Sequence, residues 1–356
     1  MSTDTATASA SITDTLWYTR CPVPTALGIA VQRGWFADEF APDGITLKSI
    51  QETNDAAAQE SHFDHTLPSS FRQGGNIPAI WARARGRDTR VIGLSWTDEF
   101  QAILALPESG IHSARDLRDL RIGLPVNPIS IDFNRASALR GFHAALGLEG
   151  LSLKNVDWID TRSSEAPDSG TRSIATGDGV RRRLRHGYQA ETLALLRGDV
   201  DAIYVKGALG LETARLIGAR IIADLGSHPD PEVRVNNGTP RTLTVDADLI
   251  EARPDLVARF LARVVDAGDW ARAHPEETVA YIARETGSTP DWVLAAYGAD
   301  AAQKLGTFLD DDSVDALSDF KDFLFAHGFL EADFDVADWI DPRPLEGIAR
   351  RTRDAA

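Results

Sequence analysis

The sequence predicts an α/β fold, because stretches with the patterning of strands alternate with stretches of helical spacing along most of the chain. Its 356 residues are too many for one hydrophobic core, so two domains are expected. A hydrophobic content of 43% and a charged content of 25% are typical of a globular protein. No internal repeat of fixed period is found. We therefore expect two α/β domains with mostly parallel sheets.

The first third of the chain opens with a short apolar strand over residues 16–19 and a helix over about 24–35 that Gly34 can end. Residues 62–75 contain Pro68 and two glycines and are expected to form a loop or a broken helix. Other elements are expected as strands over 45–50 and 91–95, a short helix over 77–85 and an apolar run over 101–106.

The middle of the chain begins with a short helix that Ser113 caps, with Asp116 three residues on, and that leads into a strand ending near Leu124. Residues 161–179 are rich in Ser, Gly, Asp and Thr and are expected to form a mobile loop. The remaining predicted elements are helices over 135–146, 190–196, 247–270, 275–286, 291–297 and 314–327, and strands over 156–159, 200–205, 220–224 and 241–245. The end of the chain, 338–356, is polar and is expected to pack loosely.

Cys21 is the only cysteine, and it stands where the first predicted strand turns into the first predicted helix. Pro22 disfavours the helical region for Cys21. A thiol just before a helix feels the positive end of the helix dipole, which favours the thiolate, and Arg20 adds a positive charge. A single cysteine is otherwise a small buried hydrophobic residue. The residues alone leave both interpretations open.

The stretch from His62 to Gly75 concentrates groups that suit an anion. The guanidinium of Arg72 offers a fork of donors to a group with two oxygens. Gly74 and Gly75 permit a close backbone approach, so their N–H groups can donate to an oxygen. His62 is suited to orient a thiol or to move a proton. We expect this stretch and Cys21 to meet in a cleft.

Charge and terminal composition exclude several classes of partner. The net charge of −16 argues against nucleic acid or an anionic membrane. Residues 1–15 contain neither Lys nor Arg and no apolar run, which predicts a disordered tail and not a signal peptide. No apolar stretch is long enough to cross a membrane. A soluble cytoplasmic protein is expected.

The order of elements resembles the type II periplasmic-binding-protein fold, in which two α/β domains close on a ligand. Residues 116–124 resemble the entry to the second domain, and 253–257 and 270–277 resemble the late helices. The resemblance covers most of residues 15–340. It implies a first domain of 15–105 and 236–356, a second domain of 106–235, and a tail of 1–14, in a monomer.

A sharper resemblance exists to the 2'-hydroxybiphenyl-2-sulfinate desulfinase family. In that family a cysteine segment like the one around Cys21 precedes a His, an Arg and a Gly-Gly pair, and His62, Arg72, Gly74 and Gly75 fall at matching spacings. The resemblance implies that Cys21, His62 and Arg72 are catalytic and that Gly74 and Gly75 bind the substrate. It implies hydrolytic cleavage of the carbon–sulfur bond of an aromatic sulfinate, with release of sulfite and without a cofactor.

The chain departs from the family pattern at three places. Arg20 stands where a small polar residue is expected, Val205–Gly210 replaces a stretch richer in tryptophan, and Phe133 is the nearest aromatic residue where the family has a tryptophan. The identity of the aromatic substrate therefore stays open. Two mechanisms also stay open, protonation of the ring carbon by the Cys21 thiol and attack of its thiolate on sulfur.

Other functions compete with a desulfinase. A cytoplasmic solute-binding or sensor protein for an aryl sulfonate or sulfinate shares the fold. A pyrimidine-precursor synthase does too, but its iron motif needs several cysteines. The segment His62–His65 could suggest a metal site, yet it lacks the convergent ligands that a metal needs, and His65 is expected in a surface loop. The basic run 181–185 is expected to be a solvated helix start or a lid contact, and Asp310–Asp312 a turn.

Overall fold

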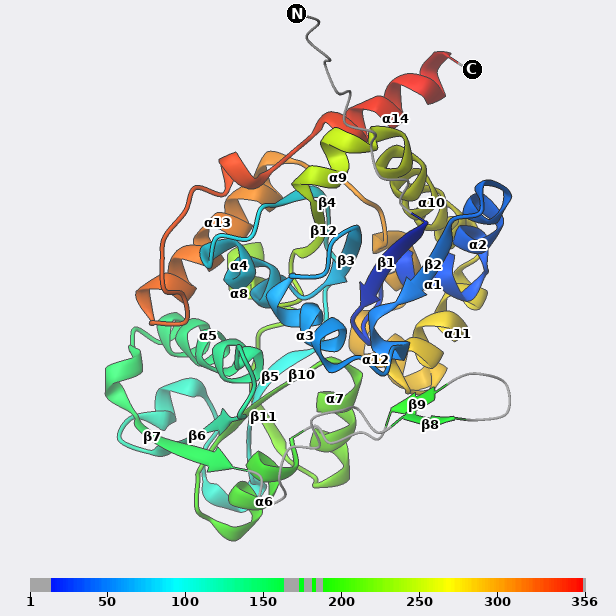
Figure 1. Ribbon diagram of the computed structural model, residues 1–356. Coiled ribbons are helices and arrows are strands. Elements are labelled where there is room, and N and C mark those ends of the chain that lie inside the picture. The colour runs from blue at the N-terminus through cyan, green and yellow to red at the C-terminus, as the bar shows by residue number, and fades with distance from the viewer. Residues whose placement is uncertain (1–13, 163–172, 176–180, 184–187, 355–356) are drawn as a thin grey trace, which may run out of the picture.

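The computed structural model describes residues 14–162, 173–175, 181–183 and 188–354. Figure 1 shows two lobes, with β1 to β4 in the upper lobe and β5 to β7 in the lower one. Of the predicted tail of residues 1–14, only Asp14 is described. Within the predicted mobile loop of 161–179, residues 161–162 end the strand Asp157–Arg162 and 173–175 form another strand, contrary to the prediction, and the other residues lie outside the described ranges.

The first lobe is built on a five-stranded sheet with the order β2-β1-β3-β12-β4. β1 pairs in parallel with β2 and β3, whereas β12 runs antiparallel to β3 and β4. The strands are β1 (Thr15–Arg20), β2 (Thr46–Ser49), β3 (Ser70–Gly74), β4 (Thr89–Ser95) and β12 (Arg241–Asp246).

Helices cover both faces of this sheet. One hydrophobic cluster joins the sheet to α1, α10 and α11, and Phe71 of β3 stacks there on Phe260 of α10 at 3.7 Å between ring centroids. A second cluster joins the other face to α4 and α13, where Val91 and Leu94 meet Phe320. The helices are α1 (Ala26–Gln32), α2 (Trp35–Phe40), α3 (Ala56–Asp64), α4 (Asn76–Ala84), α9 (Ala247–Ala252), α10 (Pro254–Ala273), α11 (Pro275–Thr286), α12 (Pro290–Tyr297), α13 (Asp311–Ala326) and α14 (Arg343–Asp354).

The second lobe repeats this plan. A three-stranded sheet of order β10-β5-β11 is joined to the parallel pair β6-β7 through a bridge between Ile122 and Ala202. Its strands are β5 (Gln101–Ala105), β6 (Arg121–Val126), β7 (Asp157–Arg162), β10 (Ile203–Lys206) and β11 (Arg220–Asp224), and β8 (Ser173–Ala175) and β9 (Arg181–Arg183) form a separate antiparallel pair. Its helices are α5 (Phe133–Leu148), α6 (Gln189–Arg197) and α7 (Gly207–Leu216), and α8 (Pro231–Arg234) lies in the segment that leads back to β12.

In each lobe one strand of the main sheet runs against its neighbours. It is β12 in the first lobe and β5 in the second, the strands that the chain forms directly after crossing from the other lobe. Because β12 and β5 each follow a segment that crosses between the lobes, they run in the direction opposite to that of the neighbouring strands, which are connected through helices. The prediction of an α/β fold is confirmed, but three strand pairings of the described residues are parallel and five are antiparallel, so the expectation of mostly parallel sheets was wrong.

The chain crosses between the lobes twice, from β4 to β5 through residues 96–100 and from β11 back to β12 through residues 225–240. The predicted boundary at residue 105 placed β5 in the first domain, yet β5 hydrogen-bonds to β10 and β11 of the second lobe. The other domain boundaries stay a prediction.

Two predicted elements in the first lobe differ from the structure. His62 lies in the last turn of α3, and residues 70–74 form a fully buried strand instead of a loop. The helix predicted over 247–270 is two helices, because Pro254 keeps Arg253 out of the helical conformation and starts α10.

Two further expectations were wrong. The C-terminal stretch does not pack loosely in its first part, since Trp339 is fully buried and donates from Nε1 to Thr89 Oγ1 at 3.1 Å. Residues Arg181–Arg183 form the strand β9 and not the start of a helix, whereas the alternative of a lid contact stays a prediction. Asp310, in contrast, accepts a hydrogen bond from Ser313 N and caps α13, which makes Asp311 and Asp312 its first turn.

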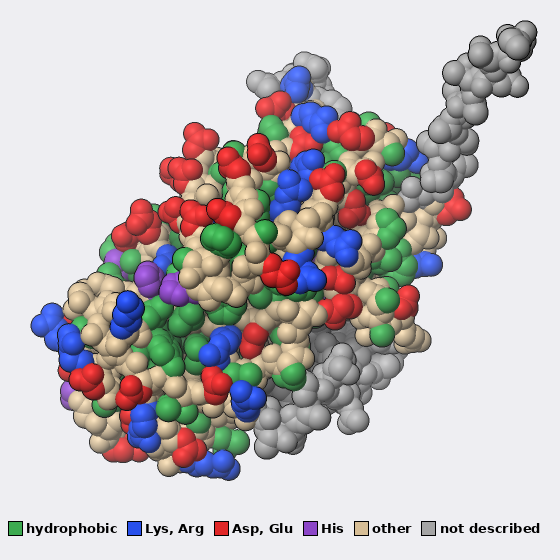
Figure 2. All heavy atoms as spheres, turned by 60° about the vertical axis from the view of Figure 1, so that its left-hand side comes forward, with side chains coloured by type: hydrophobic (Ala, Val, Ile, Leu, Met, Phe, Trp, Pro, Cys, Tyr) green, Lys and Arg blue, Asp and Glu red, His purple; other side chains and the backbone are tan. Residues whose placement is uncertain are grey.

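The surface carries the excess of acidic residues. On the face in Figure 2, acidic side chains gather over the upper part, with basic side chains among them. Across the described ranges, no helix has the length and hydropathy that a membrane span requires.

Candidate active site

The candidate site lies at the carboxyl ends of β1 and β3, two neighbouring parallel strands. Cys21 directly follows β1, and its N–H donates to Gln73 O of β3 at 3.3 Å. Its side chain is partly exposed. In parallel α/β sheets this end is where ligands bind. Cys21 is therefore not sealed in the core, and the interpretation as a reactive thiol is the one that its position favours.

Gly74 lets the thiol approach the backbone of β3. A Cβ atom on Gly74 would lie 2.2 Å from Cys21 Sγ and 2.9 Å from Cys21 Cβ. Real Cβ atoms do not come so close to another heavy atom. The absence of a side chain at Gly74 thus determines where the sulfur sits.

His62 reaches the same face through Thr19. Thr19 and Cys21 are two residues apart on an extended chain, so their side chains share one face of the sheet. Thr19 Oγ1 lies 2.7 Å from His62 Nδ1 and accepts a hydrogen bond from Gln51 Nε2. Gln51 also donates to Arg20 O, which fixes the orientation of its amide.

This arrangement selects a tautomer of His62. Thr19 is 2% exposed, and a buried hydroxyl needs an acceptor for its proton. Among the described residues His62 Nδ1 is the acceptor that Thr19 meets. The neutral imidazole then carries its proton on Nε2.

Arg72 of β3 is opposite Thr19 in the register of the two strands, so it lies on the same face. Its side chain is buried, and it donates from Nε to Ser61 O at 3.0 Å and from Nη2 to Ser61 Oγ at 2.7 Å. Burial lowers the pKa of Arg72 to about 10, and the carboxylates of Asp246 and Asp64 oppose that shift. The group stays charged at neutral pH.

One donor of this guanidinium is left over. Within the part of the chain that the structure describes, Arg72 Nη1 is buried and has no hydrogen-bond partner. Burying a cation that has an unused hydrogen-bond donor costs free energy unless an anion pairs with it. Arg72 is thus suited to bind a ligand anion on the face that carries Cys21.

Gly75 precedes the first turn of α4, and the backbone N–H groups of the next two residues already donate hydrogen bonds within the protein. Asn76 N donates to Asn237 O at 2.9 Å and Ile77 N donates to Asn237 Oδ1 at 3.0 Å, while Pro78 has no N–H. No hydrogen bond from Gly75 N is found among the described residues. Its N–H is therefore the donor that this helix start, with its positive dipole end, can offer to an anion.

Two arguments for an activated thiol were wrong. Arg20 points to the opposite face, where its Nε pairs with Glu285 Oε1 at 2.9 Å. The start of α1 is also not open to an anion, because Leu27 N donates to Gln73 Oε1 and Gly28 N donates to Thr25 Oγ1. Arg72, which shares the face of Thr19 and Cys21, supplies a positive charge on that face.

His65 is buried, and the expectation of a surface residue was wrong. It is 4% exposed, and it ends α3 in the left-handed conformation with φ 56°. Burial, with the positive charge of Arg72 and the ring of His62 nearby, holds the pKa of His65 well below its usual value. His65 is therefore neutral in the folded protein at neutral pH.

This burial predicts a pH-dependent stability. When the pH falls through the ordinary histidine pKa of about 6.5, the unfolded chain takes up a proton at His65 that the folded chain does not, so stability is lost, by at most about 1.4 kcal/mol per pH unit. We expect His65→Asn, which tolerates positive φ, to flatten the fall of the melting temperature between pH 7.5 and 5.5. Parallel falls in the two proteins would contradict this assignment.

Aromatic side chains border the site from both lobes. Phe63 lies edge-on to His62, with 4.8 Å between ring centroids, and stacks on Phe133 at the start of α5, with 6.2 Å between centroids. Phe71, by contrast, is fully buried in the core of the first lobe. Phe63 and Phe133 thus form an apolar wall where the two lobes meet.

Among the residues that the structure describes, no group of three or more His, Cys, Asp and Glu is arranged to hold a metal ion. Thr19, Gln51, Ser61 and Asn237 are partners of the site that were not predicted from the sequence. Only Thr19 carried a signal, because its spacing of two from Cys21 on a strand puts both on one face. The other three come together with the site only through the tertiary structure.

No family model matches the chain. The 2'-hydroxybiphenyl-2-sulfinate desulfinase of Rhodococcus erythropolis is 30% identical to it over 368 residues, which covers 96% of this chain and 96% of the relative. The chain belongs to the 2'-hydroxybiphenyl-2-sulfinate desulfinase family. The resemblance found in the sequence is thereby confirmed.

Solved structures give the same result. The chain is similar to a cysteine-to-serine mutant of DSZB in complex with biphenyl-2-sulfinic acid, with a TM-score of 0.73, 26% identity, and coverage of 96% of this chain and 100% of that one. It is also similar to the periplasmic aliphatic sulphonate binding protein of Escherichia coli, with a TM-score of 0.66, 14% identity, and coverage of 92% of each chain. The second likeness concerns the fold alone and confirms the predicted two-lobed, type II periplasmic-binding-protein-like architecture.

Proposed function

We propose that this protein is an aryl sulfinate desulfinase, which uses water to cleave the carbon–sulfur bond of 2'-hydroxybiphenyl-2-sulfinate or a close analogue and releases sulfite. Family membership over 96% of the chain supports the reaction. The observation that carries the assignment of the site is the convergence of a partly exposed thiol, a tautomer-fixed imidazole and a buried guanidinium on one face of β1 and β3.

The side chains take separate roles in this proposal. Arg72 and the N–H of Gly75 bind the two sulfinate oxygens, because a guanidinium and a backbone amide both donate to such an anion. Gly74 gives the sulfur of Cys21 its position. His62, which Thr19 orients, exchanges a proton with the thiol.

Cys21 acts as the acid in the favoured mechanism. The thiol gives its proton to the ring carbon that bears sulfur, the carbon–sulfur bond breaks with its electrons left on the ring, and sulfur dioxide leaves. Water adds to sulfur dioxide to give hydrogen sulfite and a proton, which restores the thiol by way of His62. The alternative, attack of the thiolate on sulfur, brings two negative charges together, which costs about 4 kcal/mol at 4 Å and an effective dielectric constant of 20.

A solute-binding or sensor function is the second candidate. A putative aliphatic sulfonates-binding protein of Bacillus subtilis is 27% identical over 316 residues, covering 88% of this chain and 81% of that protein. This likeness is weaker than the one to the desulfinase, and ligand binding alone does not call for the close approach of Cys21 to Gly74.

The test is an assay of the purified full chain with 2'-hydroxybiphenyl-2-sulfinate. We expect stoichiometric amounts of sulfite and 2-hydroxybiphenyl without added metal or cofactor. Binding of the sulfinate with no release of sulfite would favour the second candidate. A monomeric state and a cytoplasmic location stay predictions, to be tested by light scattering and by fractionation of the cells.

Gly74→Ala tests the position of the thiol. The added methyl group would overlap Cys21 Sγ, so either the thiol moves or β1 and β3 separate, at a cost of about 1–3 kcal/mol in stability. We expect sulfite release to fall at least about a hundredfold, since a displacement of 1 Å can cost that much.

Gly147→Ala is the matched control for this substitution. Gly147 lies in α5, and an added Cβ there meets no heavy atom within 4 Å. We expect unchanged activity and an unfolding free energy that stays level or rises by up to about 1 kcal/mol. Equal activity in the two variants would show that the Gly74 contact does not position the thiol.

A further inference from the structure

The side chain of Asn237 lies against Gly75, the residue whose N–H is proposed to bind the sulfinate. A Cβ atom built on Gly75 would lie 2.5 Å from Asn237 Oδ1, 2.7 Å from its Nδ2 and 2.8 Å from its Cγ. The three atoms are almost equally distant from that point, so the whole amide group faces the Gly75 backbone. Only a residue without a side chain permits this approach. Asn237 belongs to the return crossing between the lobes, so it meets the site from the hinge.

The orientation of this amide is determined by its neighbour on α4. Ile77 N donates to Asn237 Oδ1 at 3.0 Å, and because a backbone N–H only donates, the atom that it meets is the oxygen. Asn237 is 7% exposed, and no hydrogen bond from its Nδ2 is found among the described residues. Buried polar groups are almost always hydrogen-bonded. The Nδ2 donor is therefore suited to a partner from outside the chain.

The turn that carries Asn237 is docked on the start of α4. Asn76 Nδ2 donates to Asn236 O at 3.0 Å and to Pro240 O at 2.9 Å. Asn76 N donates to Asn237 O at 2.9 Å, and Asn237 N donates to Asn236 Oδ1 at 2.8 Å. A donor that is held in place before the ligand arrives loses little conformational freedom on binding.

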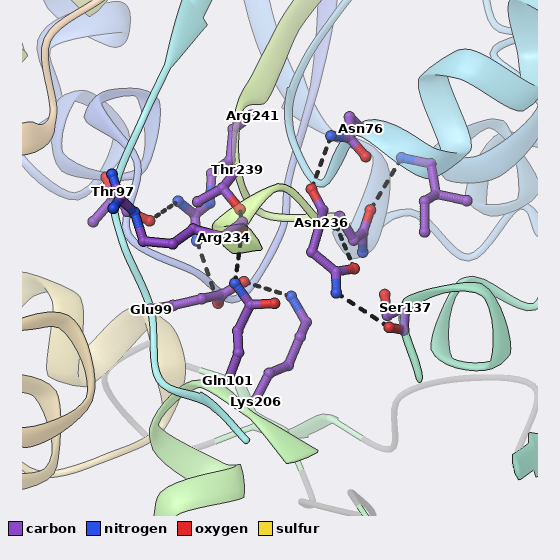
Figure 3. Close-up of polar contacts among 12 residues, drawn as sticks. Asn76, Thr97, Glu99, Gln101, Ser137, Lys206, Arg234, Asn236, Thr239 and Arg241 are labelled. Carbon is purple, nitrogen blue, oxygen red and sulfur yellow. Dashed lines mark hydrogen bonds and ion pairs between the residues drawn. The ribbon is translucent and has the colours of Figure 1, made fainter. Parts of the chain in front are cut away.

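Asn236 ties the same turn to the second lobe. Its Nδ2 donates to Ser137 O of α5 and to Tyr204 Oη, both at 3.1 Å. Figure 3 shows Asn236 between Asn76, on the side of the first lobe, and Ser137 on α5. Asn236 and Asn237 form a hinge segment that both lobes hold. The amide of Asn237 thus has a fixed position over Gly75.

Bond geometry places Asn237 Nδ2 within reach of a group bound at Gly75. The Cβ position of a residue is about 2.5 Å from its own N, so Gly75 N and Asn237 Nδ2 are no more than about 5.2 Å apart. Two N–H donors that share one oxygen can be separated by up to about 5.8 Å. The close approach of Cys21 Sγ to Gly74 likewise keeps the sulfur within about 6 Å of Gly75 N.

The opening of the site is at Gly75. Gly75 is partly exposed, whereas Gly74 and Asn76 on either side of it are buried. The two oxygens of an anion such as a carboxylate offer about four lone-pair positions, and Arg72 Nη1 and the Gly75 N–H fill two of them in a sulfinate. An amide N–H adds a donor without burying a further charge.

From these contacts we infer that Asn237 is a third sulfinate-binding residue, whose Nδ2 donates to the anion beside the Gly75 N–H. The inference rests on the proposed function and adds a substrate contact from the hinge. Oδ1 of the same amide holds the start of α4 through Ile77 N. One side chain thus has a structural atom and a ligand-binding atom, and substitutions can separate their roles.

Asn237→Asp keeps the structural atom and removes the donor. The carboxylate has nearly the shape of the amide and still accepts from Ile77 N, and a negative charge is favourable at a helix start, so the melting temperature should stay level or rise. The lost donor and the repulsion between two anions should raise the dissociation constant for 2'-hydroxybiphenyl-2-sulfinate, measured by calorimetry, at least about a hundredfold. Inhibition by 2-hydroxybiphenyl, the product without a sulfinate, should stay unchanged.

Asn237→Ala removes both atoms without adding a charge. We expect a lower melting temperature, because Ile77 N loses its acceptor, and a dissociation constant for the sulfinate that rises about tenfold. Sulfinate binding should thus be weakest in the aspartate variant although that variant is the more stable of the two. A purely structural Asn237 predicts the opposite, with wild-type binding in Asn237→Asp and impaired binding in Asn237→Ala alone.

Asn155→Asp is the matched control. Asn155 Oδ1 also accepts from a backbone N–H, that of Ser152 at 2.8 Å, and Asn155 lies before β7 in the second lobe. The substitution adds the same charge, which salt screens over distance, so the dissociation constant should stay within about twofold of the wild type.

Three results would overturn the inference: wild-type affinity for the sulfinate in Asn237→Asp, an equal loss of affinity in the two aspartate variants, or an equal loss for the sulfinate and for 2-hydroxybiphenyl. Sulfite release by the wild-type protein supports the proposed function in each of these cases. The dissociation constants can be measured whether or not sulfite is released, so failure of the two proposals can be told apart.

Discussion

Cys21→Ser is expected to lower sulfite release at least about a thousandfold while leaving the fold intact. General acid catalysis contributes about 10²–10⁴ in rate, and a serine hydroxyl is a far weaker acid than a thiol and a far weaker nucleophile than a thiolate. The exchange is nearly isosteric, and the oxygen fits the space beside Gly74 that the sulfur fills. Activity by sulfite release and the melting temperature are the two measurements.

A measurement of substrate binding distinguishes a loss of catalysis from a loss of folded structure. Arg72 and Gly75 are untouched in Cys21→Ser, so the dissociation constant for 2'-hydroxybiphenyl-2-sulfinate, measured by calorimetry, should change by less than about tenfold. A serine variant with near-normal turnover would remove Cys21 from the mechanism, and mass-spectrometric capture of a covalent adduct on Cys21 would favour attack on sulfur over protonation.

Arg72→Met and Arg72→Lys are expected to lower kcat/KM by about a hundredfold or more. A hydrogen bond to a charged group contributes about 1.5–3 kcal/mol, and the methionine variant removes both the charge and the unused Nη1 donor. Lysine keeps the charge but lacks the planar fork. Because the contact is to the sulfinate, a rise in KM should accompany the fall in kcat, more strongly for methionine than for lysine.

Arg90→Met supplies the control for a lost arginine in the same sheet. Arg90 of β4 is partly exposed and pairs with Asp88, an ion pair worth about 0–1 kcal/mol. We expect its activity to stay within twofold of the wild type. If Arg72→Met keeps the wild-type KM and loses only melting temperature, Arg72 supports the fold through Ser61 and does not bind the sulfinate.

Patterns that are short in sequence predicted the elements around the site well. The strand before Cys21 and the helix after it are present as β1 and α1, because alternation and helical spacing are local properties. The strand that carries Arg72 was missed, because Phe71 to Gly74 are buried on both sides and show no alternation, and Pro68 and the glycines gave the signal of a loop.

Contacts between residues that are far apart in sequence could not be predicted from such local patterns. Arg20 was expected beside the thiol because it is its neighbour in sequence, but adjacent residues of a strand point to opposite faces, and Arg20 meets Glu285. His65 was expected to be exposed because it falls in a stretch that was predicted as a loop, but the fold buries it near Arg72. In both cases the partner is distant in sequence, and local patterning does not show which segments pack together.

The sequence by itself determined the alternation of strands and helices, the family, and the residue types of the thiol, the imidazole and the guanidinium. The tertiary structure decided which atoms they present. It brought Thr19 to His62 across 43 positions of the chain, left Arg72 Nη1 without a partner in the described residues, and set the hinge segment of Asn236 and Asn237 between Gly75 and Ser137. The physical reason is that propensity and periodicity act over a few residues, whereas hydrogen-bond partners and burial depend on packing between segments far apart in sequence.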